Sequence, residues 1–215
     1  MSYVELHAHS AYSFLDGASH PEELALRAAE LGYEALALTD HDGVYGSLEL
    51  AHAAKLVGVR PITGAEVTLS GVGSTEPQES GGAGFAGAGA GRTAGAHVTL
   101  LVESSQGYAN LCRLLTAAHA HTRPKEGELL PPALDPVLLA ELNEGLVCLS
   151  GCARDGLGVR DPNAAAALAG AFGPERWFVA ARRTRREARS RPERRGRWRG
   201  ATARRDPGRG SVSQS

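Results

Sequence analysis

The chain has 215 residues, of which 42% are hydrophobic, so it is long enough for one domain of ordinary size, or one and a half, with a real core. It has no apolar run of about 18 residues and no basic start followed by an apolar stretch, so the sequence predicts neither a membrane span nor a secretory signal. The three cysteines form no CxxC pair, which favours a reduced, cytoplasmic compartment.

The net charge of −1 hides an uneven distribution along the chain. Residues 182–215 hold 13 of the 23 basic residues, all of them arginine, against 3 acidic residues. Such asymmetry is typical of a tail that binds nucleic acid non-specifically, or of a segment foreign to the fold. The tail has no lysine, leucine or isoleucine, a composition typical of GC-rich DNA read out of frame, and disorder is expected over 181–215 in either case.

The first seventy residues alternate between short apolar strands and amphipathic helices. The first helix is expected to begin near Ser19 as its cap, with Pro21 in the first turn, Glu22 completing a capping box, and Gly32 at its end. In chain order, the predicted elements are a strand at 3–7, this helix, a strand at 35–40, a helix at 46–57 and a strand at 60–69. This β-α-β-α-β pattern predicts parallel strands in an α/β fold.

Residues 71–96 interrupt the pattern with nine glycines and almost no bulky side chains. They are expected to form a flexible surface insertion, because they cannot bury enough apolar area to order themselves. Regular elements are predicted again after it: a strand at 97–103, helices at 107–121 and 135–143, a strand at 145–152, a helix at 161–173 and a strand at 176–180.

Side chains that could bind a metal gather near the strand ends. His7 and His9 lie two residues apart on the first strand, so both point to the same face. The other candidates are Asp16 in the loop that follows, Asp40 and His41 after the second strand, Glu66 in the third, His97 at the start of the fourth, and Cys152 after the strand at 145–152. Because the carboxyl ends of parallel strands gather on one rim, these groups are expected to converge.

Imidazoles, carboxylates and a thiol together suit zinc, manganese or iron, and carboxylates can bridge two ions about 3.5–4 Å apart for phosphate-ester hydrolysis. Structural alternatives exist: Asp16 for an Asp-Gly turn, Asp40 for a strand-to-helix link, and Cys152 as a small buried apolar residue. Glu66 is harder to explain in this way, since a carboxylate among apolar strand residues is costly unless paired. Surface or packing roles are assigned to the histidines away from strand ends, which are His20, His52, His119 and His121.

Five stretches together resemble the PHP (polymerase and histidinol phosphatase) domain at the N-terminus of bacterial DNA polymerase III alpha subunits. They are ELHAHSAYSFLDGAS, ALALTDHDGVYG, TGAEVTL, HVTLLVESSQGYANLCRLL and LVCLSGCARDG. The sequences SFLDGASHPEEL and TDHDGVYG are most similar to those of the error-prone, damage-inducible alpha subunit. The resemblance covers about residues 3–180, apart from the glycine-rich insertion.

The resemblance implies that residues 1–180 form a distorted (β/α)7 barrel with up to three divalent ions at its rim. The ligand positions carried over from the family are His7, His9, Asp16, His41, Glu66, His97 and Cys152. In the family, the first two bind one ion together and the glutamate bridges two ions. A thiol at Cys152, where free-standing PHP phosphatases tend to have histidine, points to the polymerase branch. Asp40 adjoins this set, and the family does not clearly make it a ligand.

The sequence departs from the family at its end. The family's site is completed by a late Asp-x-His, and no such motif follows Cys152. The barrel is therefore expected to be incomplete at its C-terminal end, and hydrolysis by the chain to be poor. The polymerase catalytic module is also absent, so the chain is not expected to add nucleotides.

Three functional interpretations remain open. The first is a fragment of an error-prone DNA polymerase III alpha subunit, whose partners in DNA replication and damage-induced synthesis are DNA and other polymerase subunits. The second is a free-standing metal-dependent phosphoesterase of the histidinol phosphatase kind. The third is a non-catalytic module that a metal stabilises. The motifs SGC and GYANLCRLL favour the first.

Overall fold

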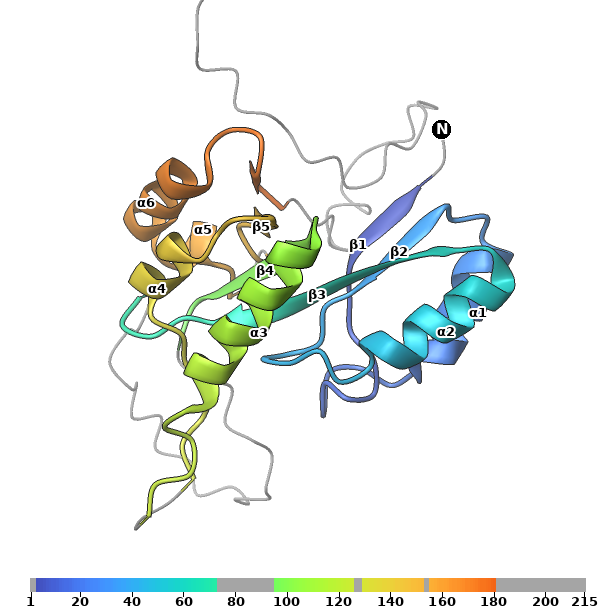
Figure 1. Ribbon diagram of the computed structural model, residues 1–215, viewed down its shortest axis with the longest axis horizontal. Helices are drawn as coiled ribbons and strands as arrows, with labels where there is room; N and C mark the ends of the chain where they lie inside the picture. The colour runs from blue at the N-terminus through green and yellow to red at the C-terminus, as the bar shows by residue number, and fades with distance from the viewer. Residues whose placement is uncertain (1–2, 73–94, 126–128, 153–154, 181–215) are drawn as a thin grey trace, which may run out of the picture.

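The elements of the structure follow the predicted order closely. The computed structural model describes residues 3–72, 95–125, 129–152 and 155–180 (Figure 1). Within these ranges the elements are β1 (Val4–Ala8), α1 (Pro21–Glu30), β2 (Ala35–Leu38), α2 (Ser47–Val57), β3 (Arg60–Thr68), β4 (His97–Val102), α3 (Ser105–His119), α4 (Pro136–Glu141), β5 (Leu146–Leu149), α5 (Leu157–Arg160), α6 (Pro162–Phe172) and β6 (Trp177–Phe178). Each predicted element is present within a few residues of its expected bounds, and the short α5 is the one addition over the described part of the chain.

The strands of the described residues form one sheet in the order β1-β2-β3-β4-β5-β6. β1, β2 and β3 are parallel, as the β-α-β-α-β pattern predicts, and β5 and β6 are also parallel. β4 runs antiparallel to both of its neighbours, β3 and β5. The sheet curls into a half-barrel, which confirms an α/β fold of the barrel type that is incomplete.

α1 begins one residue later than the sequence analysis predicts. Its N-cap is His20, not Ser19, and the carboxylate that returns to the cap is that of Glu23, whose Oε2 accepts a hydrogen bond of 2.9 Å from the backbone N–H of His20. Ser19 with Glu22 and His20 with Glu23 both have the spacing of a capping box. Pro21 decides between them, because proline favours the first helical position and so makes the preceding residue the cap.

The helices cover the sheet in two groups. α1 and α2 pack against each other beside β2 and β3, and their core includes Leu36, Leu38 and Leu50. α3 to α6 lie beside the other half of the sheet, over a larger core that includes Leu100 and Leu114 (Figure 1). Ala37, Leu101 and Leu149, from three different strands, form a third and smaller cluster.

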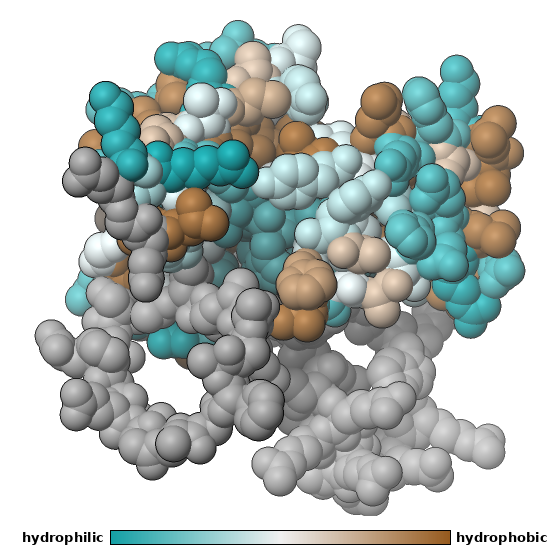
Figure 2. Space-filling view, turned by 90° about the horizontal axis from the view of Figure 1, so that it is seen from below, coloured by the Kyte–Doolittle hydropathy of each residue, from teal (hydrophilic) through white to brown (hydrophobic). Residues whose placement is uncertain are grey.

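The surface mixes apolar and polar side chains. Figure 2 shows hydrophobic residues interspersed with hydrophilic ones over one face of the molecule. Phe14 and Leu15, in the loop after β1, are 75% and 72% exposed. No helix within the described ranges is both long and apolar enough to cross a membrane. Most of the predicted insertion (residues 73–94) and the whole arginine-rich tail (181–215) lie outside the described residues.

Candidate metal centre

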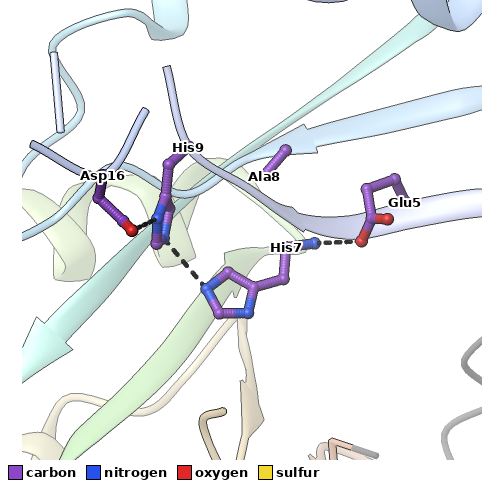
Figure 3. Close-up of a pocket in the computed structure, with 5 residues that line it drawn as sticks. All are labelled: Glu5, His7, Ala8, His9 and Asp16. Atoms are coloured by element: carbon purple, nitrogen blue, oxygen red, sulfur yellow. Dashed lines mark hydrogen bonds and ion pairs between the residues drawn. The ribbon is translucent and has the colours of Figure 1, made fainter. Parts of the chain in front are cut away.

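β1 brings His7 and His9 to one side of the strand, as their spacing predicts. Their Nε2 atoms are 3.1 Å apart, and each side chain is 15% exposed. Figure 3 shows the two rings next to each other, with the Asp16 carboxylate against His9. The residues Glu5, His7, Ala8, His9 and Asp16 line a pocket of about 300 Å³, which gives solvent access to the imidazoles.

Glu66 of β3 lies at the centre of the histidines and is 4% exposed. Its Oε2 contacts Nε2 of His7 and lies 3.6 Å from Nε2 of His9. Its Oε1 lies 3.4 Å from Nδ1 of His41 and 3.7 Å from Nδ1 of His97. Burial alone would raise the pKa of this carboxyl, but the hydrogen bonds from His7 and His9 outweigh it and hold the pKa far below its usual range. The buried carboxylate is therefore charged at neutral pH.

Asp16 supplies a second carboxylate from the loop after β1. Its side chain is 56% exposed, and its Oδ2 lies 2.5 Å from Nδ1 of His9 and 3.2 Å from Nε2 of His41. Partial burial would raise the pKa of Asp16, but these two histidines lower it overall. His9 and His41 thus lie between two carboxylates, one buried and one open to solvent.

The spacing of these atoms fits divalent metal ions. On a tetrahedral ion with bonds of about 2.1 Å, neighbouring ligand atoms are about 3.4 Å apart. The measured separations bracket this value: 3.1 Å for His7 to His9, 3.2 Å for His41 to Asp16, 3.4 Å for His41 to Glu66 and 3.6 Å for His9 to Glu66. Among the described residues, three sets of side chains have ligand atoms within 4.8 Å of one another: His7, His9 and Glu66; His9, Asp16 and His41; and His41, Glu66 and His97.

The charges of the centre also favour metal ions over protons. His9 and His41 each face a carboxylate at both ring nitrogens, so a proton on every nitrogen would make both rings cations. Their ring centres are only 4.4 Å apart, a distance at which two cations repel. Burial lowers the pKa of His9, and the carboxylates of Glu66 and Asp16 more than reverse this, so the position attracts positive charge. Metal ions supply that charge without two adjacent imidazolium rings.

His97 reaches the centre from the opposite end of a strand. Because β4 is antiparallel to β3, its first residue pairs with Thr68 at the end of β3. The expectation that the site residues follow the carboxyl ends of parallel strands is therefore wrong for His97, which begins its strand. Burial lowers the pKa of His97, which favours the neutral ring that metals bind.

Cys152 does not join any of the three sets in the described part of the chain. Its thiol is half-buried and free, and its Sγ accepts a hydrogen bond of 3.4 Å from the backbone N–H of Asp155. The loop that carries it lies against the start of β4, because the backbone N–H of His97 donates to the carbonyl of Asp155 at 3.0 Å. Six of the seven predicted ligands are thus gathered, and the seventh lies in an adjoining loop.

Asp40 stabilises the loop after β1. The sequence analysis left open whether this residue binds metal or belongs to a strand-to-helix link. It is 1% exposed, and it accepts hydrogen bonds from the backbone N–H of Ser10 at 2.7 Å, the Ser10 hydroxyl at 2.8 Å and the Ser13 hydroxyl at 2.7 Å. The Ser13 oxygen in turn accepts from the backbone N–H of His41 at 3.1 Å. Asp40 therefore orients the two segments that carry Asp16 and His41.

Asp42 is a partly buried carboxylate that the sequence analysis missed. It accepts hydrogen bonds from the backbone N–H and the hydroxyl of Thr68, at 2.8 and 2.9 Å. Burial raises its pKa, and the Thr68 hydrogen bonds act against this. Its carbonyl accepts from Nε2 of His119 at 2.7 Å, which is a packing contact of the kind expected for that histidine. The signal available in the sequence was a second aspartate directly after His41, which reads as the first residue of an Asp-Gly turn.

Known proteins resemble this chain in both sequence and fold. A family model described as the PHP domain matches residues 5–160. The error-prone DNA polymerase of Cutibacterium acnes is 41% identical over 160 residues, which are 72% of this chain and 13% of that protein. The error-prone DNA polymerase of Mycobacterium bovis is 41% identical over 188 residues, which are 83% of this chain and 16% of that protein. The chain thus spans less than a fifth of the length of these curated relatives.

One solved structure shares the fold across most of both chains. It is of a protein from Bifidobacterium adolescentis described as a metal-dependent phosphoesterase, with a TM-score of 0.52 and 12% sequence identity over 83% of this chain and 86% of that one. At this identity the likeness concerns the fold alone. The family match and the curated relatives confirm the resemblance stated from the sequence motifs, and the chain belongs to the PHP domain family.

Proposed function

We propose that this chain is the metal-binding PHP domain of an error-prone DNA polymerase. The observation that carries the metal-binding part is that Glu66, His9 and His41 are each shared between two sets of ligand atoms. Shared ligands of this kind suit ions held next to one another, because one carboxylate can bridge two metals. A cluster that served only packing would not need four imidazoles around one buried carboxylate.

The donor set indicates which ions fit. Imidazole nitrogens with carboxylate oxygens suit zinc, manganese and iron, and we propose up to three divalent ions. Bound in this centre, such ions would supply Lewis acidity and a water of lowered pKa. The protein itself supplies two nitrogens from one strand at His7 and His9, a buried negative charge at Glu66, and a solvent-exposed carboxylate at Asp16. Cys152 is proposed as a further ligand on the resemblance to the family.

Metal analysis tests this proposal. The wild-type chain, loaded with Zn²⁺ or Mn²⁺ and dialysed at neutral pH, is expected to retain at least one equivalent of metal. The double variant His7→Ala/His9→Ala is expected to lose most of it, because two of the nitrogens of the first set are removed. His52→Ala is the matched control, since His52 is exposed on α2. A wild-type protein that elutes free of metal after loading would overturn the proposal.

The role in DNA synthesis rests on the curated relatives and not on the centre. Both relatives described above are error-prone DNA polymerases, so we propose DNA and other polymerase subunits as partners of the longer protein, in replication and damage-induced synthesis. Residues 1–180 are proposed as the domain. The tail at 181–215 is proposed to make only salt-sensitive phosphate contacts, on the basis of its arginine content.

A second candidate function is phosphate-ester hydrolysis. It is favoured by the adjacent sets of ligands at a pocket of about 300 Å³, where neighbouring ions could act on one phosphate. The sequence lacks an Asp-x-His after Cys152, so turnover of bis-p-nitrophenyl phosphate with Mn²⁺ is expected near background. Clear turnover that disappears in His7→Ala/His9→Ala would favour a phosphoesterase, whereas equal rates in both proteins would identify a contaminant.

A further inference from the structure

The hydroxyl of Thr99 in β4 is buried without a hydrogen-bond partner among the described residues. Thr99 is 0% exposed, and no donor or acceptor of those residues meets its Oγ1 with the geometry of a hydrogen bond. Buried hydroxyls elsewhere near the centre have acceptors, which are Asp40 for Ser10 and Ser13, Asp42 for Thr68, and the carbonyl of Ala8 for Thr39. Because buried polar groups in native proteins are nearly always hydrogen-bonded, the hydroxyl of Thr99 calls for an explanation.

The register of the sheet places Thr99 beside the metal centre. It lies opposite Glu66 across β3 and β4, so the two side chains point to the same face, with Cβ atoms about 4.5–5.5 Å apart. His97, two residues before Thr99 on the same strand, shares this face. Val98 and Leu100 alternate with them and belong to the core that α3 covers. The hydroxyl therefore lies on the side of the sheet that carries the ligands.

Few neighbours on that face can accept the hydroxyl proton of Thr99. The residue opposite it on β5 is Leu149, and the residue two positions further along β4 is Leu101. Both leucines belong to the small apolar cluster and offer no acceptor. The polar side chains among the four neighbours are His97 and Glu66, and a carboxylate is the stronger acceptor because it is charged.

We propose that Thr99 is a positioning residue for Glu66, whose carboxylate accepts the Thr99 hydroxyl when it binds divalent ions. This inference rests on the metal-binding function proposed above. Carboxylates that bind metals are in turn hydrogen-bonded by neighbouring groups. A carboxylate oxygen has two lone pairs, so an oxygen that binds an ion keeps one for a donor. Thr99 supplies this donor from a position closed to solvent.

Glu66 has to separate from His7 if the two residues are to share an ion. In the structure, Oε2 of Glu66 contacts Nε2 of His7 directly, whereas two ligand atoms on one tetrahedral ion are about 3.4 Å apart. The strands are ordered β1-β2-β3-β4, so a carboxylate that moves away from His7 on β1 moves toward Thr99 on β4. The buried hydroxyl is thus placed where the displaced carboxylate needs a donor.

Thr99→Val distinguishes this role from packing, because valine keeps the β-branched shape and removes only the hydroxyl. In the metal-free protein the change removes a buried polar group that lacks a partner, so the melting temperature is expected to rise by about 2–4 °C or more. The affinity for Zn²⁺ is expected to fall about 10- to 100-fold, because Glu66 loses its donor. A residue that served only packing would not shift the two quantities in opposite directions.

The experiment measures thermal unfolding in EDTA and Zn²⁺ affinity by competition with a chelating dye, on the full chain and its variants. Thr99→Ser keeps the hydroxyl and is expected to bind Zn²⁺ nearly as well as the wild type. Ser47→Ala is the matched control, because Oγ of Ser47 is also buried without a partner in the described ranges but lies at the start of α2, outside the ligand sets. It should leave the affinity for Zn²⁺ unchanged.

The outcomes separate this inference from the function on which it rests. A wild type that binds no Zn²⁺ overturns the proposed function and the role of Thr99 together. If the wild type binds Zn²⁺ and Thr99→Val binds it equally well, the centre stands and the role of Thr99 is wrong. The same holds if Thr99→Ser loses as much affinity as Thr99→Val. A metal-free Thr99→Val whose melting temperature does not rise would show that the hydroxyl already has a partner, which also overturns the proposal.

Discussion

Glu66 sets the electrostatics of the whole centre from a single buried position. Its low pKa and the raised pKa of His9 are two sides of one interaction, with burial opposing both. In the metal-free protein, the contribution of His9 to stability is fully present below its unfolded pKa of about 6.5 and is lost as the pH rises through the higher folded value. The contribution of Glu66 is present above its unfolded pKa of about 4.3 and is lost as the pH falls.

The titration of His9 predicts that the melting temperature depends on pH in different ways with and without metal. The melting temperature of the metal-free chain is expected to decrease between about pH 6 and pH 8.5, because His9 loses its proton in the folded state. The additional stabilisation by Zn²⁺ is expected to grow over the same range, because ligands must be deprotonated to bind. Thermal unfolding in EDTA and in excess Zn²⁺ measures both. A metal effect that shrinks as the pH rises would contradict the ligand assignment.

The three cysteines are expected to differ in reactivity for structural reasons. Cys148 is fully buried in β5, and burial raises the pKa of its thiol far above the usual range. Cys112 and Cys152 are half-buried and accessible. A maleimide reagent at about pH 7.5 should therefore modify Cys112 and Cys152 in the native protein but not Cys148, since the thiolate is the reactive form.

Labelling also tests whether Cys152 is a ligand. If it binds an ion, Zn²⁺ should protect Cys152 and leave the labelling of Cys112 unchanged, which peptide mass spectrometry can resolve. Equal labelling of Cys152 with and without Zn²⁺ would remove it from the ligand set.

At the scale of the elements, the loop between β1 and α1 depends on one buried acceptor. Asp40 receives three donors from Ser10 and Ser13, so its removal leaves each of them without a partner. A buried donor without a partner costs about 1–3 kcal/mol. Asp40→Ala is therefore expected to lower the free energy of unfolding by roughly 3 kcal/mol, measured by urea denaturation. Asp161→Ala, which removes the N-cap of α6, should cost only about 1 kcal/mol.

Local sequence patterns predicted the elements better than their directions. The order from β1 to β3 and the parallel pairing followed from strands that alternate with helices. The direction of β4 did not follow, because the rim argument treated all strands as parallel. A signal was present: no helix is expected between residues 69 and 97, and parallel neighbours need a crossover that is usually helical. The four-residue helix α5 is too short to produce a periodic pattern.

The same distinction holds for the candidate site. His7, His9 and Glu66 could be predicted because their spacing and their places on strands are local properties. Asp42 could not, because its role depends on a left-handed backbone and on Thr68, which lies 26 residues further along the chain. Contacts between distant segments follow from tertiary packing, and one sequence does not specify them.

At the scale of the whole molecule, the sheet of the described residues has two edges, β1 and β6. Both edge strands contribute a partly buried apolar side chain, Leu6 from β1 and Phe178 from β6, and these pack against one small cluster together with Ile62 of β3. Unpaired strand edges next to apolar side chains promote association. The 1–180 segment is expected to self-associate as its concentration increases, which light scattering coupled to gel filtration can measure. A monomer at all concentrations up to about 100 µM would show that this surface is covered.

The pairing of β3 with β4 has a consequence for how the protein can change over evolution. Thr68 lies opposite His97, and the backbone N–H of Leu69 donates to the carbonyl of Ala96 at 2.8 Å. The stretch between Leu69 and Ala96 therefore has its two ends held about one strand spacing apart, roughly 4.8 Å. Doubling the length of a loop between fixed ends costs only about 0.6 kcal/mol. Lineages can therefore lengthen or shorten this stretch while Glu66 and His97 stay in register, and an experimenter can insert a tag there without changing the pairing of β3 with β4.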